Sequence, residues 1–231
     1  MAGKGKGAVV LLSGGLDSAV TLYQALADGY RVHCLSFDYG QRHGRELRHA
    51  KKIAAAAGCP LFVVKAGFPW KGSSLLDKGL RVPRRTLREA AGGIPNTYVP
   101  ARNLIFLSYA VSLAEARGCS AVFIGAHAQD YSGYPDCRPE FYRAFVKAAA
   151  AGTKAGVEGR PVRIETPLIR MGKAGIIRLG VKLGAPLGLT WSCYQGGARP
   201  CGTCDSCLFR AKGFKEVGIA DPAERKFARK N

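Results

Sequence analysis

The chain has 231 residues, of which 47% are hydrophobic and 22% charged, a composition that excludes an intrinsically disordered chain and is typical of one globular domain with a small appendage. No apolar run approaches the roughly 20 residues that a membrane-spanning helix needs. The apolar residues 8–12 near the amino terminus are too few for a signal-peptide core of about 7–15 residues. We therefore expect a cytoplasmic protein without a membrane partner.

The charge of the chain is strongly basic. Lysine and arginine number 35 against 16 aspartates and glutamates, which gives a formal net charge of +19. Such an excess attracts polyanions such as nucleotides and nucleic acids. The basic residues are densest between residues 71 and 88 and between residues 210 and 230, but they occur throughout the chain. A solvated basic surface explains this distribution equally well, so direct binding of nucleic acid is not expected from charge alone.

Short apolar runs alternate with amphipathic segments along the chain. The runs predict strands at residues 8–12, 31–37, 60–64, 121–124 and 162–164. The amphipathic segments predict helices at residues 17–27, 45–57, 103–117, 140–150 and 173–183. This alternation is typical of an α/β fold with a doubly wound, Rossmann-like parallel sheet.

Ligands of doubly wound folds bind beyond the carboxyl ends of the strands, so the loops that follow the strands are expected to carry the function. These loops are residues 13–18, 38–43, 66–102, 125–138 and 165–173. The segment 68–102 is long for a loop, which is typical of a functional lid or of a disordered stretch.

The hexapeptide SGGLDS at residues 13–18 connects the first expected strand to the first expected helix. Its glycines let backbone amides turn inward, its serines add hydroxyl donors, and the helix amino terminus favours negative charge. Asp17 would hold Mg²⁺ against phosphate oxygens. No Gly-Lys-Ser/Thr follows, which excludes a Walker A loop, and the glycines are not spaced as in a dinucleotide-binding motif. We predict that this loop binds the phosphates of a nucleotide.

Half of the eight cysteines fall within fifteen residues, at Cys193, Cys201, Cys204 and Cys207. Four thiolates match the tetrahedral coordination of Zn²⁺. An iron–sulfur cluster also takes four thiolates, but the spacing differs from ferredoxin motifs and no proline follows the last cysteine, so zinc is favoured. We expect one structural zinc ion, which holds a segment of residues 191–231 against the sheet of a domain of residues 1–190.

The SGGLDS loop resembles the pyrophosphate loop of the adenine-nucleotide alpha-hydrolase superfamily, also called N-type ATP pyrophosphatases, which have a HUP-type fold. The resemblance implies that ATP is cleaved between its α and β phosphates, that AMP is placed on a substrate oxygen, and that a nucleophile displaces the AMP. It also implies an ATP site, with Mg²⁺, at Leu12, Ser13, Gly14, Gly15, Leu16, Asp17, Ser18, Ala19, Val20, Thr21, Leu22 and Phe37.

Other segments narrow the resemblance. They are FDYGQRH at residues 37–43, GIPNTYVPARN at 93–103, DYSGYPDCR at 130–138 and ETPL at 165–168. Together with the cysteines, they resemble the 7-cyano-7-deazaguanine synthase family of the queuosine pathway, which serves tRNA modification. The resemblance implies a ligase that forms a C–N bond: ATP, ammonia and 7-carboxy-7-deazaguanine give the nitrile through an adenylated carboxylate and an adenylated amide. A homodimer is also plausible from the family.

The family reaction assigns roles to individual residues. Asp17, Ser18, Arg102 and Lys173 are the expected catalytic residues, and the two cations would neutralise phosphates or the substrate carboxylate. The remaining expected substrate-binding residues are Tyr39, Gln41, Arg42 and Asn103.

The donor edge of the deazaguanine calls for a carboxylate acceptor. Asp130 and Asp136 are the candidates, with Tyr131 or Tyr134 stacking on the ring. Asp136 could instead cap the helix expected at residues 140–150. Which carboxylate holds the edge stays open at the level of sequence.

Three other functions compete with this interpretation of the sequence. A tRNA-modifying member of the same superfamily, such as a thiolase or a lysidine synthase type, would suit the charge, but the chain leaves no room for a separate RNA-binding domain. A zinc-knuckle nucleic-acid binder would have no need of SGGLDS on a strand-to-helix turn. The sequence is also compatible with the role of relatives that attach deazapurines in DNA modification or antiviral defence.

No glutaminase domain is evident, so ammonia is expected to arrive free or from a partner.

Overall fold

The computed structural model describes residues 6–41, 44–77, 79–83, 93–127 and 133–224. Within these residues, five parallel strands form one sheet in the order β3-β2-β1-β4-β5. Each expected strand is present to within one residue. The strands are β1 (Gly7–Leu11), β2 (Arg31–Asp38), β3 (Leu61–Lys65), β4 (Ala121–Phe123) and β5 (Arg163–Glu165).

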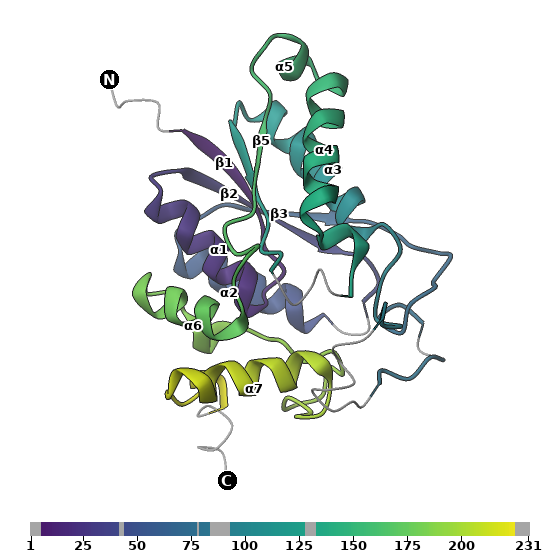
Figure 1. The fold of residues 1–231 in the computed structure, drawn as a ribbon, viewed down its shortest axis with the longest axis vertical. Helices are drawn as coiled ribbons and strands as arrows, with labels where there is room; N and C mark the ends of the chain where they lie inside the picture. Colours follow the sequence, from purple (N-terminus) through teal and green to yellow (C-terminus); the bar gives the residue numbers. More distant parts are fainter. Residues whose placement is uncertain (1–5, 42–43, 78, 84–92, 128–132, 225–231) are drawn as a thin grey trace.

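Helices cover both faces of the sheet, as Figure 1 shows. Successive side chains of a strand point to opposite faces. In β1, Val10 therefore packs in the core beneath α1 (Leu16–Ala27) and α2 (Arg45–Ala56). Its neighbour Val9 packs beneath α3 (Arg102–Ala116) and α4 (Pro139–Gly152). This arrangement confirms the predicted doubly wound α/β fold.

The chain changes direction across the sheet at β1. From β1 it extends the sheet through β2 to β3, then crosses back to β4 and β5 on the other side. Val10 is paired with Cys34 of β2 and with Phe123 of β4, so the three strands end at the same edge. A crevice beyond this edge, at the reversal of strand order, is where doubly wound folds bind their ligands.

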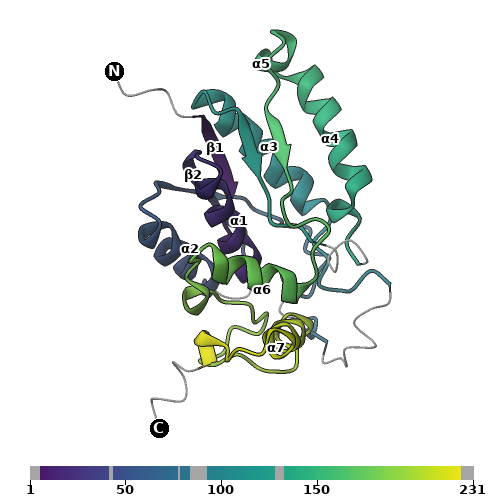
Figure 2. The same cartoon turned by 60° about the vertical axis from the view of Figure 1, so that its left-hand side comes forward.

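The carboxyl-terminal region adds two helices, α6 (Lys173–Lys182) and α7 (Asp205–Val217), which lie next to one another in Figures 1 and 2. Phe214 of α7 packs with Ile176 and Ile177 of α6 and with Val20 of α1. In this part of the segment, Phe214 thus meets the helix layer of the domain of residues 1–190. None of the described helices is long and apolar enough to cross a membrane. Shorter helices are α5 (Lys154–Val157), η2 (Pro135–Cys137) and η3 (Leu187–Leu189).

The long segment between β3 and α3 contains neither helix nor strand in its described residues 66–77, 79–83 and 93–101. It is nevertheless tied together, because the backbone N–H of Ser74 donates to the carbonyl of Asn96 at 2.8 Å and its hydroxyl donates to Oδ1 of Asn96 at 3.1 Å. Of the basic residues between Lys71 and Arg88, Lys78, Arg84, Arg85 and Arg88 lie outside the described residues.

Candidate active site

A cavity of about 240 Å³ lies beyond the carboxyl ends of β1, β2 and β4. The phosphate loop (residues 13–18) lines one side of it, and the first turns of α2 and α3 and residues from the cysteine-rich segment line the rest. Aromatic side chains make up much of its wall: Phe37, Tyr39, Phe106, Tyr134, Trp191 and Tyr194. A polar end and aromatic walls suit a planar heterocycle that carries a charged group.

The phosphate loop is held in shape by its own hydrogen bonds. The hydroxyls of Ser13 and Ser18 lie 3.0 Å apart, and the hydroxyl of Ser18 donates to the carbonyl of Gly15 at 3.0 Å. Gly14 has a φ of 88°, and a Cβ there would lie 2.2 Å from the carbonyl oxygen of Glu46. A glycine is required at this position, because the loop packs directly against the backbone of α2.

Apart from Gly14, which packs against the backbone of α2, the residues predicted for the ATP site divide into two groups. Those that line the cavity are Leu12, Ser13, Gly15, Leu16, Asp17, Ser18 and Phe37. The side chains of Ala19, Val20, Thr21 and Leu22 are buried in α1 and are not part of the cavity wall. Ala19, Val20 and Leu22 position the loop by packing α1 onto the sheet and onto α6.

Asp17, Lys173 and His127 form one polar cluster beside the loop. Nζ of Lys173 lies 2.7 Å from Oδ1 of Asp17 and 3.0 Å from Nε2 of His127, and Nε2 of His127 lies 3.5 Å from Oδ2 of Asp17. Burial raises the pKa of Asp17, but the charges and hydrogen bonds of Lys173 and His127 outweigh it and hold the pKa well below its usual range. Asp17 is therefore ionised at neutral pH and suited to bind a cation.

Arg102 opens α3 and faces the cavity from the opposite side. Its Nη1 donates to the hydroxyl of Tyr39 at 3.4 Å, and no acidic side chain of the described residues lies within ion-pair distance of it. The preceding residue, Ala101, has a left-handed backbone with φ 55°, an uncommon conformation for a residue other than glycine. Burial raises the pKa of Tyr39 to about 12, although Arg102 lowers it. The guanidinium is thus positioned to receive an anionic ligand.

Two residues of the site escaped the sequence analysis, His127 and Glu46. His127 lies in the loop after β4, which was expected to carry function, but nothing in its spacing distinguishes it. Glu46 lies in the first turn of α2, three residues after the FDYGQRH segment, and lines the cavity. Burial raises the pKa of Glu46 to about 7, although the charge of Arg102 lowers it. Its position three residues after FDYGQRH is the feature of the sequence from which a role of Glu46 in the site could have been predicted.

Four residues predicted to bind the substrate line the cavity: Tyr39, Gln41, Asn103 and Tyr134. The Gln41 side chain also shapes the turn after β2, since it accepts from the backbone N–H of Tyr39 at 2.8 Å and donates to the carbonyl of Phe37 at 3.3 Å. The hydroxyl of Tyr134 lies 2.8 Å from that of Thr97, which holds the aromatic ring in the wall. Arg42, Asp130 and Tyr131 lie outside the described residues.

Asp136 was expected either to accept from the deazaguanine edge or to cap the helix that follows it, but its hydrogen bonds are made to Asn103. Its Oδ2 accepts a hydrogen bond from the backbone N–H of Asn103 at 2.9 Å, and Nδ2 of Asn103 donates back to the carbonyl of Asp136 at 3.3 Å. It therefore caps α3, and the alternative that it caps the helix after it is wrong. The buried side chain of Asp136 does not line the cavity.

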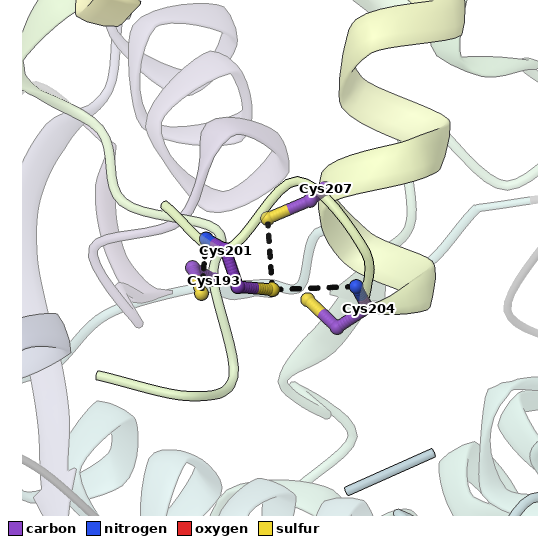
Figure 3. Close-up of side chains that lie close together, drawn as sticks. All are labelled: Cys193, Cys201, Cys204 and Cys207. Carbon is purple, nitrogen blue, oxygen red and sulfur yellow. Dashed lines mark hydrogen bonds between the residues drawn. The ribbon is translucent and has the colours of Figure 1, made fainter. Parts of the chain in front are cut away.

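The four cysteines predicted to bind metal converge, as Figure 3 shows. Their Sγ atoms all lie within 4.8 Å of one another. The backbone N–H groups of Gln195 and Cys201 donate to Sγ of Cys193 at 3.4 and 3.3 Å. Such bonds stabilise thiolates, and four sulfurs at this separation fit one tetrahedral ion with no open position. The cluster can therefore hold a metal ion in a structural role.

The cysteine cluster is joined to the phosphate loop. The backbone N–H of Trp191 donates to the carbonyl of Gly14 at 2.9 Å, and its indole Nε1 donates to the carbonyl of Cys193 at 2.8 Å. The guanidinium of Arg45 in α2 lies 4.8 Å from the centre of the Trp191 ring. The cluster thus fixes one wall of the cavity.

The doubly wound fold, the glycine- and serine-rich loop at the reversal of strand order and the closed cysteine site together define an ATP-dependent α/β enzyme. The family described as queuosine biosynthesis protein QueC matches residues 7–218, and the chain belongs to this family. The resemblance expected from the sequence is confirmed.

Curated relatives agree with this assignment. A 7-cyano-7-deazaguanine synthase of Acetivibrio thermocellus is 56% identical over 218 residues, which cover 94% of this chain and 96% of the relative. Another, of an Anaeromyxobacter species, is 53% identical over 221 residues, 94% of this chain and 95% of the relative. The solved structure of NMN synthetase from Francisella tularensis has a TM-score of 0.48 at 14% identity and covers 98% of this chain and 78% of that chain.

Proposed function

We propose that this chain is an ATP-dependent 7-cyano-7-deazaguanine synthase that converts 7-carboxy-7-deazaguanine and ammonia into the nitrile. The observation that carries the proposal is the cavity in which a phosphate loop, the Arg102 guanidinium and an aromatic wall meet. Membership of the queuosine biosynthesis family supports the same substrate.

The nucleotide end of the cavity is the phosphate loop. Its backbone amides and the hydroxyls of Ser13 and Ser18 bind the phosphates that leave as pyrophosphate. The ionised carboxylate of Asp17 fits Mg²⁺, which would neutralise phosphate charge when bound. Lys173, 2.7 Å from Asp17, reaches the same phosphates as a second positive charge.

Arg102 lies at the end of the cavity that binds the carboxylate of the substrate. The aromatic wall holds the deazaguanine ring, and the guanidinium orients its carboxylate toward the nucleotide. A carboxylate oxygen attacks the α-phosphorus and pyrophosphate leaves, which forms the acyl-adenylate. Ammonia then forms the C–N bond as the C–O bond to AMP breaks. The amide oxygen attacks a second ATP in the same way, and loss of AMP and of the two nitrogen protons gives the nitrile.

Zinc is the metal proposed for the cysteine cluster, because four thiolates without an open position are typical of structural zinc sites. The division into an ATP-binding domain of residues 1–190 and a zinc-binding segment of residues 191–231 belongs to the same proposal. A homodimer, and ammonia that arrives free or from a partner, are proposed from the family resemblance.

A mass assay of the purified protein with Mg-ATP, ammonium and the acid tests the proposal. We expect nitrile and AMP from the wild type and neither from Asp17→Ala. Asp28→Ala removes an exposed carboxylate from the end of the same helix and should behave as the wild type. If zinc-loaded wild type makes neither nitrile nor amide, the assigned substrate is wrong, and tRNA is the next substrate to test.

A further inference from the structure

The amidation step requires ammonia beside the acyl carbon, but ammonia is mostly ammonium at neutral pH. A site that concentrates this cation in the cavity would therefore aid the reaction. Two carboxyl groups line the cavity among the described residues, Asp17 and Glu46. Asp17 is paired with Lys173 at 2.7 Å. Glu46 has no hydrogen-bond or ion-pair partner among the described side chains, so its carboxyl group is open to a ligand.

Glu46 lies near both the phosphate loop and Arg102. Its backbone carbonyl abuts Gly14 of the phosphate loop, where the nucleotide binds. Its carboxyl group is within the electrostatic reach of Arg102, which we assign to the substrate carboxylate. The acyl carbon forms where nucleotide and carboxylate meet, and Glu46 borders both.

We propose that Glu46 binds the ammonium ion that the amidation step consumes. The inference rests on the proposed function. The carboxylate accepts one proton from ammonium, and the freed lone pair forms the C–N bond to the acyl carbon. The C–O bond to AMP breaks, AMP leaves with the electron pair, and the nitrogen releases a second proton to water. Among the described residues, the charged and titratable groups that face Glu46 are Arg102 of α3, Tyr39 after β2 and Cys193 of the cysteine cluster.

The test compares two substrates in the metal-loaded protein: the acid with ammonium, and the corresponding amide, which needs no ammonium. We expect Glu46→Gln to raise the KM for ammonium about 10-fold or more at pH 7.5. At a pH above the pKa of ammonium, where ammonia is free, most of the loss should be recovered. The rate from amide to nitrile should stay within about 2-fold of the wild type. Glu140→Gln, an exposed glutamate on α4, is the matched control.

The inference is overturned if Glu46→Gln leaves the KM for ammonium unchanged. It is also overturned if the variant loses the acid and amide reactions equally, because Glu46 would then hold the heterocycle or the fold. Loss of the acid reaction without recovery at high pH is a third contradiction. If the wild type makes no nitrile from either substrate, the proposed function itself fails, and the inference fails with it.

Discussion

At the scale of single residues, the raised pKa of Glu46 makes the stability of the protein depend on pH. Its pKa is about 7 in the folded protein against an ordinary 4.5, chiefly because of burial. The folded protein therefore binds the proton more tightly than the unfolded chain does. Ionisation of Glu46 lowers the free energy of unfolding. This decrease grows between pH 4.5 and 7 and stays constant above pH 7.

Replacing Glu46 by glutamine should therefore stabilise the protein at high pH. We expect the free energy of unfolding of Glu46→Gln to exceed that of the wild type by roughly 1–2 kcal/mol at pH 8 and to differ little at pH 4. Urea unfolding of the metal-loaded proteins at both pH values measures the difference. Glu140→Gln should show no such dependence on pH. A variant less stable than the wild type at pH 8 would contradict the origin given for the raised pKa.

How well single residues could be predicted depended on whether a local pattern marked them. Asp17 belongs to a hexapeptide, and the cysteines have metal-ligand spacing, so the sequence alone singled them out. Glu46 has no such pattern, because its function depends on a cavity built from distant segments. Asp136 was misplaced for the same reason, since the N–H group that it caps belongs to Asn103, 33 residues away.

At the scale of elements, the buried Arg210 attaches α7 both to Asp221, which follows the helix, and to the segment before the cysteines. Nε and Nη2 of Arg210 donate to the two carboxylate oxygens of Asp221, and its Nη1 donates to the hydroxyls of Thr190 and Ser192 at 2.7 and 3.1 Å. Arg210 and Asp221 are both buried. Ser192 also lines the cavity, so this pair connects the packing of α7 to the site.

Removing one partner of this pair should be costly. Arg210→Ala leaves the Asp221 carboxylate buried without its cation, and we expect the free energy of unfolding to fall by about 3–5 kcal/mol. Lys212→Ala on the same helix breaks only an exposed pair with Glu216 and should cost less than about 1 kcal/mol. Chemical denaturation of the metal-loaded proteins gives both values. Equal effects of the two variants would contradict this account.

The strands and most helices could be predicted because their apolar periodicity reflects burial on the sheet. The helix α7 was missed, because its charged residues and cysteines interrupt any apolar stripe. Its burial is local, with Phe214 meeting α6 and Arg210 satisfied by side chains from the preceding segment. Neither contact is visible before the tertiary structure is known.

At the scale of the whole molecule, the cysteine cluster connects three distant parts of the chain. Val82 from the long segment after β3 packs against Trp191 and the cysteines, and Trp191 is bonded to the phosphate loop. The fold class was predictable because it follows from the order of elements. The shape of the cavity was not, because it depends on how these three parts meet around the metal site.

Removing the metal should therefore affect the nucleotide site more than the sheet. We expect one zinc ion per chain by elemental analysis. Chelation should lower the midpoint of thermal unfolding and weaken ATP binding about 10-fold or more, with most of the far-ultraviolet circular dichroism kept. Re-addition of zinc should restore both. Iron in place of zinc, or ATP binding unaffected by chelation, would contradict the assigned metal or its link to the loop.

The bond from Trp191 to Gly14 also has a consequence for synthesis on the ribosome. The phosphate loop precedes most of the sheet in the chain, and the residues that complete its cavity, from Trp191 to Ser206, follow only after the five described strands have been made. A nascent chain that has completed its sheet therefore still lacks one wall of its nucleotide site. The emerging polypeptide acquires this wall only when the cysteine-rich segment has been made and folds back onto the loop.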